Sequence, residues 1–144
     1  MVNLRPLTED DLEFLLEVRN NDSTIRFLEN NSKFTLEESK SWFKNTQPKW
    51  FIIEVNRFPV GYIRTNEDEV GCDIHPSFRR RGYAKMAYEL YLKDKNYASL
   101  WVFESNFAKD LYEKLGFTPT GDSKLVRGEN YIKMVWQNGT VGSS

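Results

Sequence analysis

The chain has 144 residues, 40% of them hydrophobic and 15% aromatic, which is the size of one domain with enough apolar side chains for a core. Its 20 Lys and Arg residues almost balance 21 Asp and Glu residues, so the net charge of -1 gives no overall attraction for nucleic acid or an anionic membrane. The apolar runs are strand-sized, far below the ~20 residues of a membrane span, and the charged N-terminus does not read as a signal peptide. We therefore expect one cytoplasmic domain over residues 1–137 and a polar tail at 138–144.

The N-terminal half reads as a strand, two helices and a β-hairpin. Thr8 can cap the first helix, and Thr35 with Glu38 forms a capping box at the start of the second. Asn56 and Arg57 lie between two runs of aromatic and β-branched residues, which predicts a hairpin turn. The expected strands are 2–7, 49–55 and 58–65, and the expected helices are 8–21 and 34–45, with a helical turn within 23–30.

The C-terminal half reads as a strand, helix, strand unit followed by a helix and a hairpin. Val70, Cys72 and Ile74 alternate with polar residues, as in a strand with one apolar face. Because a helix follows and then another strand, this unit predicts a parallel strand pair. The expected strands are 69–74, 98–103, 117–126 and 130–136, and the expected helices are 83–93 and 105–117, the last capped by Ser105 or Asn106 and ended by Gly116.

A single cysteine and a single histidine exclude a disulfide framework and a Cys/His zinc site, so no metal is expected. Cys72 lies in an apolar run, and its neighbour His75 would point to the opposite face of the strand. This favours a small buried side chain over a catalytic nucleophile. His75, beside Pro76 at a strand end, is either a base or, more commonly for such a position, a surface residue.

The stretch "HPSFRRRGYAKMAYEL" combines three arginines with the start of a helix. Neither G-x-G-x-x-G nor the P-loop pattern is present. A strand that ends at Ile74, a loop, and a helix that begins at Gly82 would nevertheless direct free backbone N–H groups at an anion. A solvated basic cluster and a nucleic-acid patch are the alternatives, and the acidic remainder of the chain argues against the latter.

Two motifs resemble the Gcn5-related N-acetyltransferase (GNAT) family. The acetyl-CoA-binding segment of that family has Arg/Gln-x-x-Gly-x-Gly/Ala at the start of a helix, matched here by Arg79, Gly82 and Ala84. A second family signature is matched by Asn106, Ala108, Tyr112, Gly116 and Phe117. The resemblance covers nearly the whole chain apart from the tail. It implies a mixed α/β (α+β) fold: a mostly antiparallel central sheet of six to seven strands, with helices on both faces and a splayed parallel strand pair at the cofactor site.

The resemblance also implies how acetyl-CoA would bind as a co-substrate, without a metal. Backbone N–H groups from Arg80, Arg81, Gly82, Tyr83 and Ala84, with the Arg79 side chain nearby, would hold the pyrophosphate. The N–H of Ile74 would face the thioester carbonyl, where a donor lowers the barrier as negative charge develops on the oxygen. Asn106 would bind the pantetheine arm, and Tyr112 would donate to the departing sulfur.

The catalytic assignments have alternatives. Tyr112 lies on an apolar helix face and could simply pack there. As general base we favour Asp73, with Glu69 on the same strand face, Glu54, Glu104 or water as alternatives. A carboxylate with an ordinary pKa near 4 is a poor base for an ammonium group unless burial raises that pKa.

The acceptor is the least defined part of the interpretation. In this family the N-terminal helices and the last hairpin usually form the acceptor site, and Phe27, Phe34, Trp42 and Phe43 are candidates here. For Trp42 and Phe43 core packing is the favoured explanation, because their helix needs an apolar stripe. We expect an N-acetyltransferase that acts on a primary amine of a protein N-terminus, an amino sugar or another small molecule, by direct attack in a ternary complex. A non-catalytic acyl-CoA-binding or interaction module is the alternative. The expected partners are a small-molecule or peptide amine, with no nucleic acid or membrane, and the protein would be a monomer or homodimer.

Overall fold

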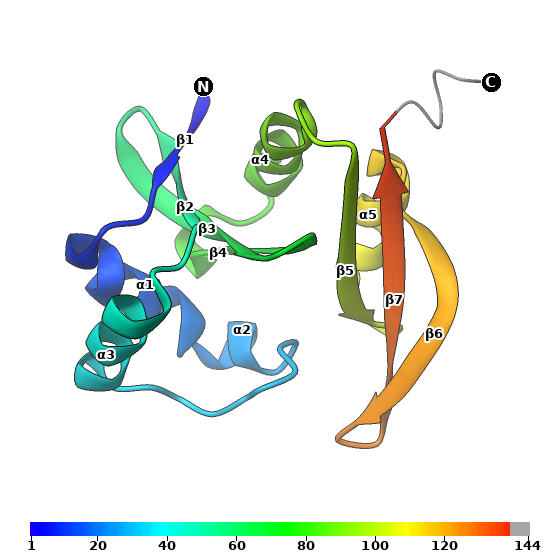
Figure 1. Ribbon diagram of the computed structural model, residues 1–144, viewed down its shortest axis with the longest axis horizontal. Coiled ribbons are helices and arrows are strands. Elements are labelled where there is room, and N and C mark those ends of the chain that lie inside the picture. The colour runs from blue at the N-terminus through cyan, green and yellow to red at the C-terminus, as the bar shows by residue number, and fades with distance from the viewer. Residues whose placement is uncertain (139–144) are drawn as a thin grey trace.

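The computed structural model describes residues 1–138, so the predicted tail lies outside the described residues apart from Asn138. Seven strands and the helices between them follow the predicted order closely (Figure 1). The strands are β1 Val2–Pro6, β2 Phe51–Val55, β3 Phe58–Asn66, β4 Glu69–Ile74, β5 Tyr97–Phe103, β6 Thr118–Val126 and β7 Glu129–Gln137. The α-helices are α1 Leu12–Arg19, α2 Asp22–Ile25, α3 Leu36–Thr46, α4 Tyr83–Leu92 and α5 Ala108–Leu115, and short 3-10 helices cover Glu9–Asp11 (η1) and Pro76–Phe78 (η2).

One mixed sheet contains all seven strands in the order β1-β2-β3-β4-β5-β7-β6. Every neighbouring pair is antiparallel except β4 and β5, which are parallel and pair at a single position, Glu69 opposite Ser99. Beyond that pair the two strands diverge (Figure 1). The predicted fold, with its splayed parallel pair, is confirmed.

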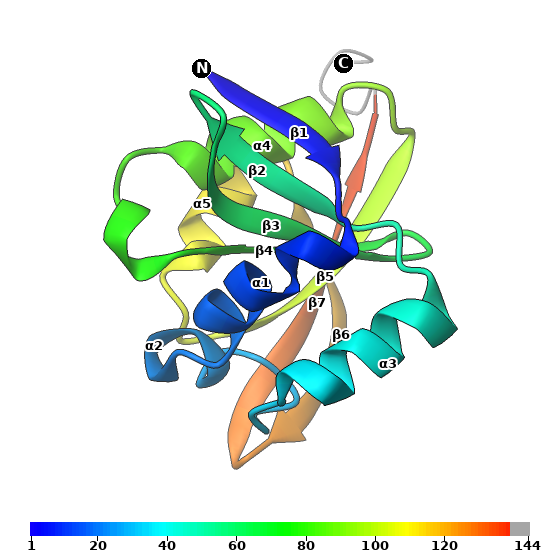
Figure 2. The same ribbon diagram turned by 90° about the vertical axis from the view of Figure 1, so that its left-hand side faces the viewer.

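Helices cover both faces of the sheet (Figure 2). On one face α1 and α3 pack over a core that includes Leu12, Val18 and the fully buried Tyr62. On the other face α4 and α5 cover the larger core, which includes Tyr88 and Phe117. None of the helices in the described part of the chain is long and apolar enough to cross a membrane.

Local sequence explains most element boundaries. Asn56 and Arg57 both have positive φ, 53° and 72°, which matches the twist that a tight hairpin turn needs. The capping box of Thr35 and Glu38 forms as predicted, with the Thr35 hydroxyl 3.1 Å from the Glu38 N–H and the Glu38 carboxylate 2.8 Å from the Thr35 N–H. Gly116 ends α5 at φ 103°.

Candidate active site

The divergence of β4 and β5 opens a cleft of about 580 Å³ that we call the large cleft. It extends from the N-terminal end of α4 past β4 and β5 to α5, and α2 lies along its rim. Of the ten residues that the sequence analysis selected, nine line this cleft: Asp73, Ile74, Arg79, Arg80, Gly82, Tyr83, Ala84, Asn106 and Tyr112. The tenth, Arg81, lines a separate groove beside Phe14 and Phe58.

The N-terminal end of α4 forms one wall of the large cleft. Arg80 and Gly82 adopt left-handed backbone conformations, with φ 65° and 80°, and this turns the chain sharply into the helix. The first bond within the helix runs from the Met86 N–H to the Gly82 carbonyl, at 3.2 Å. The N–H groups of the preceding turn have no helical partner, and the positive end of the helix dipole lies behind them. This wall can therefore bind an anion.

The three consecutive arginines have three different environments. Arg79 donates from Nε to the Ile74 carbonyl at 3.0 Å, and its other nitrogens bind the hydroxyls of Ser23 at 2.6 Å and Thr24 at 2.8 Å. Arg80 is exposed and lines the large cleft. The Arg81 guanidinium lies 5.8 Å from the centre of the Phe78 ring. The Arg79 side chain thus ties α2 to the end of β4, and Arg80 is the arginine with a free side chain at the cleft.

The backbone of β4 directs one N–H group into the splayed gap. The His75 N–H donates to the Val60 carbonyl of β3 at 2.8 Å, and Gly61 lies opposite Ile74. Because N–H groups alternate in direction along a strand, the Ile74 N–H points away from β3 and toward β5. Arg79 binds the Ile74 carbonyl, which fixes the next peptide, between Ile74 and His75. A carbonyl oxygen in the gap would meet a rigid donor.

Tyr112 of α5 projects into the large cleft next to Tyr88 of α4. The Tyr88 hydroxyl donates to the Tyr112 oxygen at 3.5 Å. Burial raises the pKa of Tyr112 to about 12, although the hydrogen bond from Tyr88 acts in the opposite direction. Tyr112 therefore keeps its proton near neutral pH, and that proton is available for another acceptor.

Cys72 is only partly buried, because it packs against the core beneath α4 and also lines the large cleft. Desolvation raises the pKa of its thiol, so the thiolate needed for nucleophilic attack is disfavoured. His75 accepts a hydrogen bond from the Ser77 N–H at 3.1 Å and stacks on Phe14. It lies in the groove that contains Arg81 rather than in the large cleft.

The carboxylates considered as bases are dispersed. Asp73 lines the large cleft, but its carboxylate binds Arg64 Nε at 2.9 Å. Glu54 pairs with Arg5 at 2.7 Å on β1 and β2, and Glu104 lines a surface cavity beside β6. Glu69 lies in a pocket next to Tyr112. Asp73 and Glu69 each line a cavity that Tyr112 also lines, and of these two only Glu69 makes no ion pair within the described residues.

That pocket, which we call the middle pocket, has a volume of about 290 Å³ and lies beside the large cleft. The two cavities share five lining residues: Leu28, Arg64, Trp101, Tyr112 and Tyr131. The rings of Trp101 and Tyr131 stack with their centres 5.6 Å apart, and Glu69 lies on the same pocket wall as Gly71. Tyr112 thus stands where the two cavities meet.

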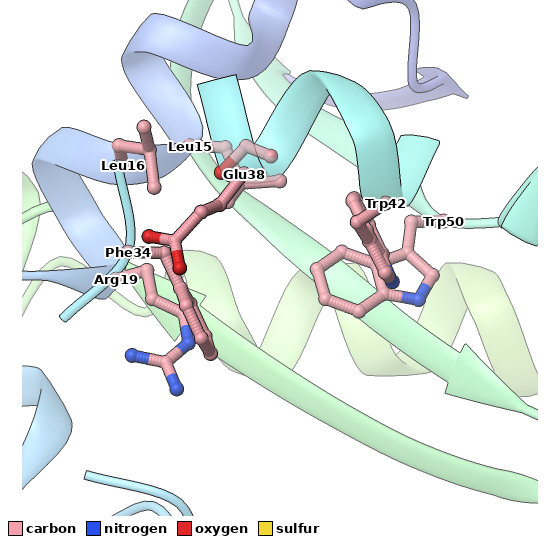
Figure 3. A pocket seen from close by; sticks show the side chains of 8 residues that line it. Leu15, Leu16, Arg19, Phe34, Glu38, Trp42 and Trp50 are labelled. Carbon is pink, nitrogen blue, oxygen red and sulfur yellow. The ribbon is translucent and has the colours of Figure 1, made fainter. Parts of the chain in front are cut away.

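A third cavity, the α1–α3 pocket, has a volume of about 280 Å³ and lies between these two helices (Figure 3). Trp42 and Trp50 pack edge to face in it, with centres 4.8 Å apart. Of the predicted acceptor-site aromatics, Phe34 and Trp42 line this pocket, Phe27 lines the large cleft, and Phe43 packs into the core under α3.

Sequence reasoning did not single out several residues that line the cavities. Arg64 could have been connected to Asp73 only through the hairpin register that sets Arg64 opposite Gly71. Trp101 and Tyr131 come from β5 and β7, whose pairing no local pattern reveals. A buried arginine, Arg19, gave no sequence signal because it reads as the basic end of a helix.

Residues 2–118, most of the chain, match the family model described as "Acetyltransferase (GNAT) domain". The chain belongs to the GNAT family. The matched segment includes α4 and α5, which carry the two motifs.

Individual GNAT relatives agree with the family match. A peptidyl-lysine N-acetyltransferase, YjaB of Salmonella typhimurium, is 33% identical over 129 residues, 87% of this chain and 89% of the relative. Among solved structures, spermidine N-acetyltransferase from Vibrio cholerae, in complex with CoA and spermine, superposes with a TM-score of 0.86 at 19% identity over 96% of each chain. The protein yncA of Salmonella typhimurium, with its cofactor acetyl-CoA, has a TM-score of 0.75 at 18% identity, over 95% of this chain and 94% of yncA. At these identities the two structures establish the fold.

Proposed function

We propose that this protein is an N-acetyltransferase that moves the acetyl group of acetyl-CoA to a primary amine by direct attack within a ternary complex. The observation that carries the proposal is the position of Tyr112, whose side chain lines both the large cleft and the middle pocket. One cavity would hold the thioester and the other the amine. The reacting atoms would then meet beside a protonated phenol.

The large cleft has the groups that acetyl-CoA needs. The free N–H groups at the start of α4 and the exposed Arg80 suit a pyrophosphate. Asn106 uses its side-chain oxygen to accept from the Ala108 N–H at 2.9 Å, which leaves its amide NH₂ free for the pantetheine arm. When bound, acetyl-CoA supplies the acetyl group as a thioester.

Two donors of this chain would act on the reacting atoms. The Ile74 N–H would stabilise negative charge on the thioester oxygen as the amine attacks, which lowers the barrier more than it strengthens ground-state binding. Tyr112 would donate its proton, or a hydrogen bond, to the departing sulfur. With a pKa of about 12 against about 8.5 for an ordinary thiol, full proton transfer is not driven, so the hydrogen bond is the stronger contribution.

The acceptor amine must lose a proton before or during attack. The Asp73 carboxylate is already engaged by Arg64 Nε at 2.9 Å, so it is not a free group at the site. We propose that Glu69 attracts the ammonium group to the middle pocket and that water carries the proton to solvent. Peptidyl-lysine and polyamines, the acceptors named for the two relatives, are the first amines to test.

Release of free CoA tests the proposal. Purified protein should release CoA from acetyl-CoA when supplied with a panel of amines: amino acids, peptides with free N-termini, peptidyl-lysine, spermidine and amino sugars. Tyr112→Phe should lower kcat at least tenfold with little change in acetyl-CoA affinity measured by calorimetry. Binding of acetyl-CoA without CoA release for any amine would instead support a non-catalytic acyl-CoA-binding module.

A further inference from the structure

The α1–α3 pocket and the middle pocket share Arg19 and Trp50 in their walls. Trp50 stacks on Tyr62 and packs against Trp42, so its ring is held from two sides. In Figure 3 Arg19 and Phe34 lie together, apart from Trp42 and Trp50. The two pockets are therefore neighbours, with Arg19 and Trp50 in the walls of both, and the α1–α3 pocket also contains the Glu38 carboxylate, which lies near Arg19 in Figure 3.

Arg19 is a buried cation without a counter-ion. Only 8% of its surface is exposed, and no carboxylate among residues 1–138 lies within ion-pair distance. Its guanidinium donates to the Ser32 carbonyl at 3.0 Å and to the Asn30 carbonyl at 2.8 Å. A guanidinium has five N–H groups, so further donors remain along the walls that it forms. Burying a charge without a partner is costly, which is a reason to expect an anion there.

The other charges around the middle pocket are largely matched. Arg64 pairs with Asp73 at 2.9 Å, and Lys124 pairs with Glu29 at 2.9 Å. Two charges in the pocket wall make no ion pair within the described chain: the buried Arg19 and the exposed Glu69. The pocket thus presents one free positive and one free negative charge.

We propose that the acceptor is amphoteric: a primary amine that also carries a carboxylate and an apolar side chain, the chemistry of a free apolar amino acid. This inference rests on the proposed function and names the substrate class of the same site. Arg19 binds the carboxylate, Glu69 attracts the ammonium group, and Tyr112 marks the end of the pocket at which the amine reacts.

The α1–α3 pocket accounts for the apolar side chain. Its walls are mostly apolar, with Leu15, Leu16 and the rings of Phe34, Trp42 and Trp50 (Figure 3). Ser39 and Glu38 complete the lining, and the Glu38 carboxylate accepts from the Thr35 N–H at 2.8 Å in the helix cap. The Arg19 guanidinium lies 4.6 Å above the Phe34 ring, which keeps the charge at the boundary of the apolar region. A polyamine would bring further positive charge to Arg19, and a lysine within a peptide would bring no carboxylate.

Matched acceptors test the inference. Leucine, leucinamide and 3-methylbutylamine share one side chain and differ in the carboxylate, as do phenylalanine, phenylalaninamide and phenethylamine. We expect kcat/KM for the amino acids to exceed that for their amides and amines about 10- to 100-fold, the value of a charge-assisted hydrogen bond. The amino groups of the amides are less basic than those of the amino acids, which alone would favour the amides, so an acid-over-amide preference cannot arise from amine basicity. The alkylamines are more basic than the amino acids, so the acid-to-amide comparison is the decisive one.

Variants separate charge recognition from loop structure. Arg19→Gln should reduce the ratio of kcat/KM for leucine to kcat/KM for leucinamide to nearly one. Arg19→Lys should retain part of this preference. Asn20→Ala is the matched control: Asn20 holds the same loop through two bonds to Phe34, at 2.8 and 3.0 Å, but lines none of the three cavities. Asn20→Ala should leave the ratio unchanged even if it lowers both rates. An equal or higher rate with amides, or an unchanged ratio in Arg19→Gln, would overturn the inference.

Acceptor binding, measured without catalysis, distinguishes a failure of this inference from a failure of the proposed function. Calorimetry of leucine and leucinamide against the CoA-loaded protein should show tighter binding of leucine, lost in Arg19→Gln. If leucine binds in this way but no amine releases CoA, the proposed function fails and the amphoteric ligand stands. If spermidine or peptidyl-lysine releases CoA while the amino acids neither bind nor react, the proposed function stands and the inference fails.

Discussion

The guanidinium of Arg64 occupies the space that a side chain at Gly71 would need. A Cβ on residue 71 would lie 2.5 Å from Arg64 Cζ, and Arg64 reaches across this glycine to bind Asp73 at 2.9 Å. Gly71→Ala should therefore displace Arg64 and leave the Asp73 carboxylate, 10% exposed, without its partner. We expect a loss of about 1.5–3 kcal/mol in the free energy of unfolding.

A double-mutant cycle checks this coupling. In an Arg64→Ala background Gly71→Ala should cost clearly less, because the obstructing side chain is already gone; we expect a coupling energy of at least about 1 kcal/mol from urea unfolding. Additive losses would show that Gly71 is required for some other reason.

The arginine run provides a matched pair of charge deletions. Arg80 lines the large cleft and Arg81 lies over Phe78 outside it. Arg80→Ala should weaken acetyl-CoA binding about tenfold, the value of one charge-assisted hydrogen bond of about 1.5 kcal/mol, and Arg81→Ala should change it less than twofold. Calorimetry at one fixed salt concentration measures both. Equal losses would mean that only the summed charge of the run matters.

We expect cofactor binding to require the absence of a side chain at Gly82, in addition to the left-handed backbone conformation there. A Cβ at this position would meet nothing closer than Met86 Cε at 4.0 Å, so the space in front of it is open to a ligand. Gly82→Asp would put a negative charge where we propose that the pyrophosphate binds, and we expect acetyl-CoA binding to disappear. Gly128→Asp is the control, because Gly128 has the same φ of 80° in the β6–β7 turn, with nothing within 4 Å. If Gly128→Asp impaired binding equally, backbone strain would be the cause.

Buried tyrosines should make the protein sensitive to alkali. Burial raises the pKa of Tyr112 to about 12 and also raises the pKa values of Tyr62 and Tyr88 above their ordinary value near 10. Below about pH 10 the tyrosines are neutral in both the folded and the unfolded chain, so they add no pH dependence. Above it the unfolded chain loses protons that the folded chain keeps, and stability falls with rising pH up to about 12.

Urea unfolding at about pH 8 and about pH 11 would measure this loss. Tyr112→Phe should reduce the loss in the free energy of unfolding between these two pH values. Tyr97→Phe is the control and should leave this loss unchanged, because Tyr97, at the start of β5, is 37% exposed. Tyr62→Phe should also cost nothing at pH 8, because the buried Tyr62 hydroxyl has no hydrogen-bond partner in the described chain. An unchanged slope in Tyr112→Phe would show that its hydroxyl is more accessible to water than its position indicates.

Sequence reasoning predicted the fold well because local signals agreed with one another. The Thr35 and Glu38 capping box, the Asn56 and Arg57 turn and the alternation along β4 each involve residues close in sequence. The strand, helix, strand order from β4 to β5 then indicated the parallel pair, because such a connection cannot be made by a hairpin.

The roles of the candidate site residues stay predictions, but the structure shows where these residues lie. Nine of the ten selected residues line the large cleft, since the two motifs sit at the ends of elements that converge there. Three consecutive arginines look alike in a sequence, so the different environments of Arg79, Arg80 and Arg81 could not be predicted from it. Arg79 finds hydroxyls on Ser23 and Thr24, more than fifty positions earlier in the chain.

The sequence by itself determined which segments are helices and strands, the turn at Gly82 and the two motifs of an acetyltransferase family, because these depend on backbone preferences and on spacing along the chain. Only the tertiary structure decided that Arg64 engages Asp73, that Tyr112 stands between two cavities, and that Arg19 is buried with no ion-pair partner among residues 1–138. The physical reason is that charge pairing and burial depend on strand register and on the packing of helices against the sheet, and these bring together side chains that no local pattern connects.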